Sequence, residues 1–177
     1  MSGRVLAICA LLFAHGMAAA KDEADLLRVV LPDTCQISAE VRRDAESACW
    51  YLECGDRPLQ QLACDVTAMH QIAELSLAPD GQSLAVLSVG EGHPILEWVA
   101  LSPLRDQGQY QVLCEQNPYP GTIWLNGWQD GQMKIGASVD LRIDGAESRI
   151  DVSDPRDFAF LWSANPCALT EQPPSSK

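Results

Sequence analysis

The sequence has few basic residues, with 12 Lys and Arg against 24 Asp and Glu in 177 residues and a formal net charge of −12. Nucleic acids and anionic lipids are bound through basic patches, so this balance argues against both as partners. Long hydrophobic runs are also scarce. The run Val5–Phe13 has nine residues, too few to span a bilayer, and no later stretch is long and apolar enough to do so.

Motifs that would identify a catalytic or metal site are missing as well. No G-x-S-x-G nucleophile elbow occurs, because Gly136-Ala137-Ser138-Val139-Asp140 departs from that pattern at its last position. No CxxC pair occurs, and only His70 and His93 remain beyond the N-terminal segment. The late aspartates fit no EF-hand spacing and alternate with arginines, so we expect solvated turns and local ion pairs at Asp140, Asp144, Asp151, Asp154 and Asp157. We therefore expect no catalytic residues, no metal, no cofactor and a protein that is not an enzyme.

The first twenty residues have the features of an export signal. Arg4 supplies a positive charge, Val5–Phe13 an apolar core, and Ala18-Ala19-Ala20 the small residues of a cleavage site before Lys21. This segment carries one basic residue and no acid, so 11 basic residues would face 24 acidic ones in the mature chain, for a net charge of −13. We expect a periplasmic or secreted protein that does not insert into a membrane after cleavage.

Three stretches of the remaining chain resemble one another and predict a repeat architecture. Their aspartates Asp33, Asp80 and Asp130 lie 47 and then 50 residues apart, a spacing typical of repeat folds. Pro and Gly beside these aspartates favour tight hairpin turns between strands. The stretches are Val30-Leu31-Pro32-Asp33-Thr34, Leu77-Ala78-Pro79-Asp80-Gly81-Gln82 and Gly127-Trp128-Gln129-Asp130-Gly131-Gln132.

Each repeat is predicted to hold four short antiparallel strands. The middle repeat shows them most clearly, at 74–77, 83–89, 95–101 and 109–114. The last repeat has segments at 122–127, 133–139, 148–152 and 158–162, and the first at 27–31, 49–54 and 59–64. The expected fold class is all-β, with three propeller-blade-like four-stranded antiparallel repeats bridged by disulfides. They form one domain over residues 21–168, after the signal peptide at 1–20 and before a disordered polar tail at 169–177.

Residues 37–70 allow a second interpretation. Apolar residues recur there at helical spacing in two sets. In the first set, Ser38 could cap the helix, and the second set follows Pro58. The sets are Ile37, Val41, Ala45 and Ala48, and Leu59, Leu62, Ala63 and Val66. The alternative is therefore an α+β fold with a short helical hairpin at 37–70. The aromatic stretch Cys49–Cys54 favours a strand instead.

Six cysteines remain after signal removal, and an even number in an exported chain predicts disulfides, here with 15 ways to pair. If 50–53 and 59–63 form a hairpin, the numbers of paired positions sum to about 113, which Cys49 and Cys64 satisfy. Cys114 is then best matched by Cys167, after the last predicted strand. Cys35 and Cys54 remain for each other.

The segment Leu77-Ala78-Pro79-Asp80-Gly81-Gln82-Ser83-Leu84-Ala85-Val86 resembles the core of the TolB-type, WD40-like β-propeller repeats. Residues 50–62 are similar to the third and fourth strands of that family, and 128–132 to a weaker second copy. The resemblance implies a propeller blade that presents a protein-interaction surface, and it transfers no catalytic residue. Propellers usually have at least four blades, so three repeats would close unusually, pair with another chain or pack as a sandwich.

Tryptophans concentrate in the second half of the chain, at Trp98, Trp124, Trp128 and Trp162. Tryptophan fills spaces between sheets and also anchors interfaces, so both roles are open. Pro118-Tyr119-Pro120-Gly121 forms an aromatic loop beside two of them. The candidate interaction surface is Tyr119, Trp124 and Trp128.

The leading functional hypothesis is an exported, non-enzymatic protein-interaction module of the cell envelope. Its partner would be an unidentified envelope protein, and self-association into a homo-oligomer stays open. The alternative is a small secreted inhibitor or ligand-binding protein that uses a protruding loop such as 117–122. A hydrolase with dispersed active-site residues is a second alternative.

Overall fold

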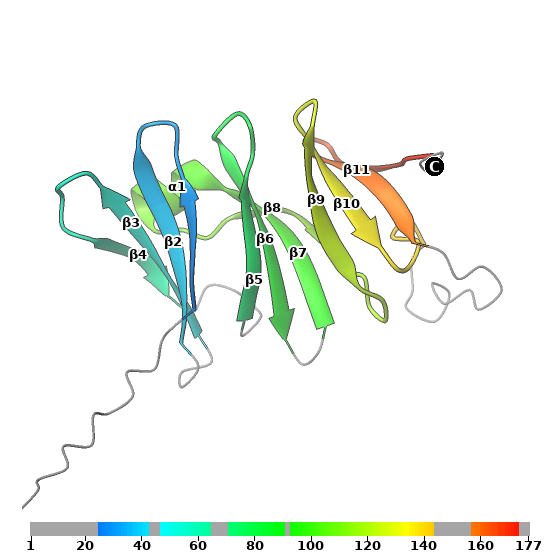
Figure 1. The fold of residues 1–177 in the computed structure, drawn as a ribbon, viewed down its shortest axis with the longest axis horizontal. Helices are drawn as coiled ribbons and strands as arrows, with labels where there is room; N and C mark the ends of the chain where they lie inside the picture. The colour runs from blue at the N-terminus through cyan, green and yellow to red at the C-terminus, as the bar shows by residue number, and fades with distance from the viewer. Residues whose placement is uncertain (1–24, 43–46, 65–70, 91–92, 144–156, 174–177) are drawn as a thin grey trace, which may run out of the picture.

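The computed structural model describes residues 25–42, 47–64, 71–90, 93–143 and 157–173. In these ranges the chain forms three four-stranded antiparallel sheets that stand side by side (Figure 1). The predicted signal peptide, the strand expected at 148–152 and the tail residues 174–177 lie outside the described residues. The all-β class is confirmed, and the described sheets form an open row rather than a closed ring.

Within each sheet, every strand pairs with the next strand along the chain. Sheet 1 contains β1 (Asp25–Val30), β2 (Cys35–Arg42), β3 (Ser47–Cys54) and β4 (Gln60–Cys64). Sheet 2 contains β5 (Gln71–Leu77), β6 (Ser83–Gly90), β7 (His93–Ala100) and β8 (Val112–Gln116). Sheet 3 contains β9 (Ile123–Gln129), β10 (Gln132–Ala137), β11 (Phe158–Ala164) and β12 (Cys167–Glu171).

The repeated aspartates lie in the hairpin turns that open the three sheets. Asp130 and Gly131 have φ values of 50° and 79°, the left-handed pair of a two-residue hairpin turn between β9 and β10. In sheet 2, the Gly81 N–H donates to the Ala78 carbonyl at 2.8 Å, and Gly81 has φ 68°. The turn chemistry predicted from the sequence therefore fixes the register of these hairpins.

The turn of sheet 1 has the same form with different residues. Thr34, at φ 66°, takes the left-handed position that Gly81 occupies in sheet 2, and its N–H donates to the Leu31 carbonyl. Asp33 accepts a hydrogen bond from the Cys35 N–H at 3.2 Å, as Asp80 accepts one from two residues further on. The first stretch thus forms the same turn with threonine at the position of the glycine.

The helical hairpin considered for residues 37–70 is wrong over the described part of that range. Ile37 and Ala39 are fully buried on one face of β2, which pairs with β3 along its whole length. A strand forms here because successive side chains of a strand point to opposite faces of the sheet, and one face of sheet 1 packs on sheet 2.

A helix occurs where a strand end and a loop were expected. The strand predicted at 95–101 ends at Ala100, and α1 (Leu101–Gln107) follows, so the strand predicted at 109–114 begins only at Val112. Leu101 and Leu104 are buried against the first core, and Gly108 caps the helix in a left-handed conformation.

Sheet 3 corrects two further predictions. The segment 158–162 was expected to be the fourth strand, but β11 pairs with β10 as the third. The fourth strand is β12, so residues 169–171 belong to the sheet rather than to a disordered tail. The cause is a tight β11–β12 hairpin at Asn165-Pro166, which brings Cys167 opposite Ala164.

Two cores hold the sheets together. The first joins sheets 1 and 2, with Trp50 of β3 and Val86 of β6 among its buried members. The second joins sheets 2 and 3 through Trp98 and Trp162. Sheet 2 therefore packs on both faces, and nearly every residue of β6 is buried. Among the described residues, sheets 1 and 3 each pack on another sheet through one face.

Three disulfides complete the fold, between Cys35 and Cys54, Cys49 and Cys64, and Cys114 and Cys167. These are the pairs expected from the sequence. The first two lie within sheet 1, whereas the third links β8 of sheet 2 to β12 of sheet 3. Three bridges indicate an oxidising, extracytoplasmic compartment. In the part of the chain that the structure describes, no helix is long and apolar enough to cross a membrane.

Candidate interaction surfaces

A cavity of about 640 Å³ opens between sheets 2 and 3, at the end where the hairpin turns lie. The β5–β6 turn, the start of α1 and the β11–β12 hairpin contribute its walls. Trp98 lines it, together with polar side chains that could hydrogen bond a small polar molecule: Asp80, Gln82, Ser102, Arg105, Ser163 and Asn165.

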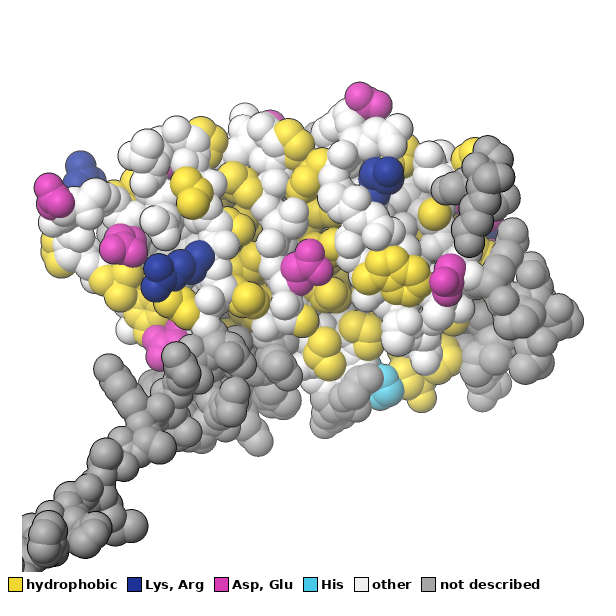
Figure 2. All heavy atoms as spheres, viewed as in Figure 1, with side chains coloured by type: hydrophobic (Ala, Val, Ile, Leu, Met, Phe, Trp, Pro, Cys, Tyr) yellow, Lys and Arg dark blue, Asp and Glu magenta, His cyan; other side chains and the backbone are white. Residues whose placement is uncertain are grey.

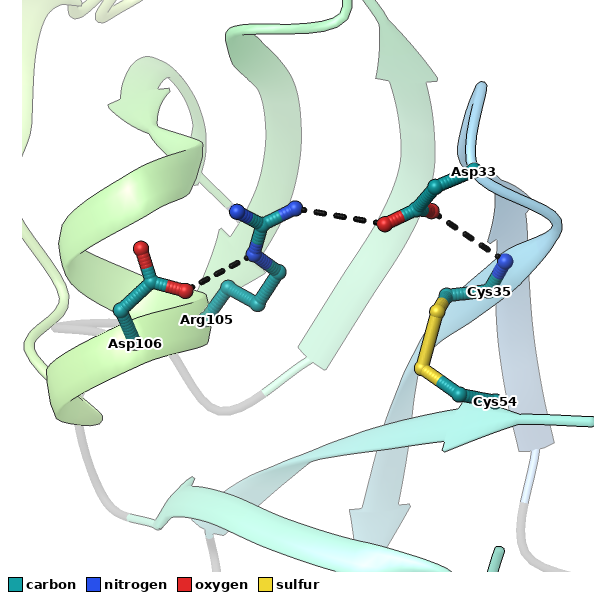
Figure 3. Close-up of a disulfide and its surroundings, with 5 residues drawn as sticks. All are labelled: Asp33, Cys35, Cys54, Arg105 and Asp106. Atoms are coloured by element: carbon teal, nitrogen blue, oxygen red, sulfur yellow. Dashed lines mark hydrogen bonds and ion pairs between the residues drawn. A yellow bond between two sulfur atoms is a disulfide. The ribbon is translucent and has the colours of Figure 1, made fainter.

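Arg105 of α1 lies between two carboxylates (Figure 3). Its Nε donates to Asp106 Oδ1 at 2.9 Å, and one terminal nitrogen lies 3.4 Å from Asp33 Oδ2 in the first turn of sheet 1. The hydrogen bonds from Arg105 and Ser102 lower the pKa of Asp106, and the Asp106 hydrogen bond raises the pKa of Arg105. The arginine therefore holds α1 against the disulfide-linked start of sheet 1, because Asp33 also binds the Cys35 backbone.

A buried carboxyl group lies inside the first core. Glu97 of β7 is 6% exposed, and Tyr110 donates its hydroxyl to Glu97 Oε2 at 2.7 Å. Burial raises the pKa of Glu97, the Tyr110 hydrogen bond opposes that rise, and the charge of Glu115 adds to it. Burial and the neighbouring carboxylate also hold the pKa of Tyr110 well above its usual value. Trp50 packs against the Tyr110 ring at 5.7 Å, so the pair is enclosed between sheets 1 and 2.

The three residues expected to form an interaction surface lie in three different settings. Trp128 packs edge-on to Trp98 at 5.3 Å, and its Nε1 donates to Ser76 Oγ at 2.9 Å, so it belongs to the junction of sheets 2 and 3. Trp124 lies over Gly136 on the other face of sheet 3. Tyr119, 44% exposed in the loop before β9, packs edge-on to His93 at 4.4 Å.

Three of the four late tryptophans pack between sheets. Trp98 touches both Trp128 and Trp162, the latter at 5.2 Å, and its Nε1 donates to Ser83 Oγ at 2.6 Å. Edge-to-face packing at these distances is the favoured arrangement of aromatic rings. The core-packing role therefore holds for Trp98, Trp128 and Trp162, and Trp124 is the tryptophan turned away from that core.

Asp140, one of the late aspartates that the structure describes, forms a local ion pair. Arg142 binds both carboxylate oxygens of Asp140, at 2.9 and 2.7 Å, and also reaches Glu171 of β12 at 2.8 Å. His70 and the aspartates at 144, 151 and 154 lie outside the described residues. Within the described ranges, no group of three His, Cys, Asp or Glu residues is placed to hold a metal ion.

Sheet 1 turns one mixed apolar and charged face away from sheet 2. A shallow groove of about 370 Å³ runs over it, lined by Leu26, Arg28, Ser38, Glu40, Tyr51, Glu53 and Leu59. Leu26 is 41% exposed, Leu59 58% and the neighbouring Val30 64%. Figure 2 shows hydrophobic side chains among acidic and basic ones at this end of the molecule. We call this surface the outer face of sheet 1.

Sheet 3 has a corresponding outer face, opposite the second core. Met133 and Ile135 of β10 point into that core, so the intervening Lys134 and the following Gly136 lie on the other side. Trp124 pairs with Gly136 and Leu161 pairs with Lys134 across the sheet. Lys134 is the one lysine in the described ranges, and no described carboxylate forms an ion pair with it.

These features define a disulfide-bridged all-β protein of three stacked four-stranded sheets, whose two outer faces are not covered by any other sheet of the described residues. No protein-family model and no curated protein matches the sequence. Among solved structures, the uncharacterized protein lmo1340 from Listeria monocytogenes EGD-e is similar, with a TM-score of 0.56 and 12% sequence identity. The match covers 84% of this chain and 40% of that one. This similarity concerns the fold alone.

Sequence reasoning missed both the outer face of sheet 1 and the Glu97–Tyr110 pair. The outer face could have been found by reading 35–42 as a strand, since Ser38 and Glu40 then share one face with the other groove residues. Glu97 stands in a run of apolar strand residues, Ile95–Leu101, where a lone acid signals a buried partner.

Proposed function

We propose that this protein is an exported, non-enzymatic interaction module, active in the periplasm or after secretion, whose outer sheet faces bind a protein partner. One observation carries the proposal. The outer face of sheet 1 leaves Leu26, Val30 and Leu59 exposed, whereas both faces of sheet 2 are covered by neighbouring sheets. A surface groove that exposes apolar side chains beside charged ones is a feature of protein interaction sites.

Two other features support this proposal. The predicted export signal and the three disulfides fit a protein that works outside the cytoplasm. The resemblance of residues 77–86 to TolB-type propeller repeats, which implies an interaction surface, points the same way.

The test is a binding experiment with the mature protein as exported, using site-specific photocrosslinking from the position of Leu59. We expect a crosslinked protein adduct that is lost in Val30→Lys. The matched control is Val112→Lys, because Val112 is also an apolar, exposed strand residue (39% exposed) but lies on β8, away from the outer face. No adduct at all, or an adduct equally abundant in all three proteins, would contradict the proposal.

A ligand-binding role is the second candidate, and the 640 Å³ cavity between sheets 2 and 3 favours it. Its polar lining suits a small polar molecule. Because Trp98 lines the cavity, a bound ligand would change the tryptophan fluorescence. A screen of small polar metabolites should give a saturable change that Gln82→Ala weakens. A screen without saturable binding would remove this candidate.

A further inference from the structure

We propose that the partner of the outer faces is a second copy of this chain. Two copies associate head to tail, so that the outer face of sheet 1 in each copy packs on the outer face of sheet 3 in the other. The two contacts close a ring of six sheets. This inference deepens the proposed function, on which it rests, by naming the partner.

The arrangement within one chain supplies the first argument. Sheet 2 shows how a sheet of this protein is covered, with one neighbouring sheet on each face. Sheets 1 and 3 each lack one such neighbour in the described structure. Rings of radially packed four-stranded sheets close with four to eight members, so three are too few and two copies of three lie within that range.

The side chains of the two outer faces are complementary. The face of sheet 1 carries two acids, Glu40 and Glu53, with one base, Arg28. The face of sheet 3 carries Lys134, which has no ion-pair partner among the described residues although acids outnumber bases twofold in the chain. A lysine without an ion pair to any described carboxylate fits an acidic surface supplied by another chain.

The apolar parts of the faces are complementary as well. Leu26 and Leu59 border the groove on sheet 1. On sheet 3, Trp124 spreads its indole over Gly136 and Leu161 lies one strand away. Exposed aliphatic side chains on one face would thus meet an aromatic ring and a leucine on the other, which is the composition of an interface centre.

The area that a stable interface must bury also indicates two face-to-face contacts rather than one. Four strands about 4.8 Å apart and about six residues long present a face of roughly 380 Å². One face-to-face contact then buries about 760 Å² in total, below the roughly 1,200–2,000 Å² of a stable interface. Two contacts in a closed pair reach about 1,500 Å². Closure therefore favours a discrete dimer over an open chain of copies.

The first test is the mass of the mature protein in solution, measured by light scattering on a sizing column at concentrations up to about 100 µM, a range that detects micromolar affinities. We expect twice the mass of one chain. Leu59→Lys on sheet 1 and Lys134→Glu on sheet 3 should each weaken the dimer at least tenfold, while Val112→Lys leaves it unchanged. Circular dichroism checks that each variant is folded.

Mixing the two variants gives the decisive result. In a mixed pair, the intact sheet 3 of the Leu59→Lys chain can meet the intact sheet 1 of the Lys134→Glu chain, so one good contact is restored. The mixture should dimerise more tightly than either variant alone. A contact between two identical faces would instead leave one variant dimeric by itself, which would overturn the head-to-tail arrangement.

Three other outcomes would overturn this inference. They are a monomer at every concentration, a dimer indifferent to both variants, and a ladder of ever larger assemblies. A monomer that still forms the Leu59 crosslink with a different protein would refute the self-association but leave the proposed function standing. A monomer without any crosslink would refute both.

Discussion

The two junctions between sheets contain different kinds of contact. The first junction, between sheets 1 and 2, contains the buried Glu97–Tyr110 pair, helix α1 and the exposed Arg105–Asp33 contact, with no disulfide across it among the described residues. The second junction, between sheets 2 and 3, contains the Trp98, Trp128 and Trp162 cluster and the Cys114–Cys167 bridge. The two disulfides of sheet 1 both join strands within that sheet.

This difference suggests how each end of the molecule is stabilised. Sheet 3 is held to sheet 2 by large aromatic surfaces and a covalent link, and it needs no bridge of its own in the described residues. Sheet 1 is made rigid internally and then docks through an apolar core and a few polar contacts. Substitutions at the two junctions should therefore have effects of different size and different pH dependence.

The largest effect is expected at the centre of the second junction. Trp98→Ala removes a ring that touches two other tryptophans and leaves Ser83 without its indole donor. Replacing a buried tryptophan with alanine typically costs about 3–5 kcal/mol of unfolding free energy. Urea denaturation of the variant measures the loss, with Trp98→Phe as the control that keeps a ring. A loss below about 1 kcal/mol would show that the cluster does not hold the junction.

Removing the covalent link comes next. The double substitution Cys114→Ser and Cys167→Ser opens a bridge between residues 53 positions apart and should cost up to about 4 kcal/mol. The matched pair Cys35→Ser and Cys54→Ser opens a 19-residue separation within sheet 1 and should cost less. Hydrogen exchange should become faster in β12 for the first variant only. Equal loss of protection in sheet 1 would refute the assignment of that bridge to the second junction.

The first junction is broken most specifically at the end of α1. Gly108 has φ 65°, and a Cβ there would collide with the Leu62 carbonyl of β4. Gly108→Ala should therefore cost about 2–3 kcal/mol, from the left-handed conformation and the clash with sheet 1. Gly131→Ala is the control, because Gly131 also has a positive φ but open space around its Cα. If thermal unfolding shows equal losses for both, α1 does not press on sheet 1 as described.

The smallest effect concerns the buried carboxyl group and depends on pH. The raised pKa of Glu97 means that the fold favours its protonated form. Its stabilising contribution is then complete below the unfolded-state pKa, which is about 4.3 for glutamate, and is lost as pH rises through the folded pKa. Glu97→Gln should be nearly neutral at acidic pH and stabilise the protein by about 1 kcal/mol at pH 8, since the amide still accepts from Tyr110.

Denaturation curves at the two pH values measure this effect. Glu115→Gln is the control, because Glu115 faces Glu97 across the β7–β8 pair but is exposed. A loss of stability at pH 8 in Glu97→Gln would show that the ionised carboxylate is favourable in the first junction.

Local turn chemistry and cysteine spacing made much of the fold predictable. Asp80-Gly81 and Asp130-Gly131 marked hairpins that the structure contains, and the hairpin register around Cys49 and Cys64 led to the observed bridge. These features succeed because a tight turn and its flanking strands are decided by neighbouring residues.

Features that depend on tertiary packing were not predictable in the same way. The spacing of Ile37 and Val41 fits helical and strand periods equally, and the burial of Ile37 and Ala39 in the core shared with sheet 2 selects the strand. Helix α1 is seven residues long, too short for a periodic signal, although Pro103 in its first turn and Gly108 after it are ordinary boundary residues. The expected Tyr119, Trp124 and Trp128 surface came from their closeness in sequence. Regular alternation would put Trp124 and Trp128 on one face of β9, but the β9–β10 register shifts between these two residues and puts them on opposite faces of sheet 3.

The most direct test of the three-sheet arrangement is a disulfide map of the native protein. Digestion with Glu-C and chymotrypsin separates Cys49 from Cys54, because Trp50, Tyr51 and Glu53 lie between them. Mass spectrometry without reduction should then find Cys35 joined to Cys54, Cys49 to Cys64 and Cys114 to Cys167. Any peptide that joins Cys49 to another cysteine, or that joins Cys167 to sheet 1, would contradict the strand register and the separation of the two junctions.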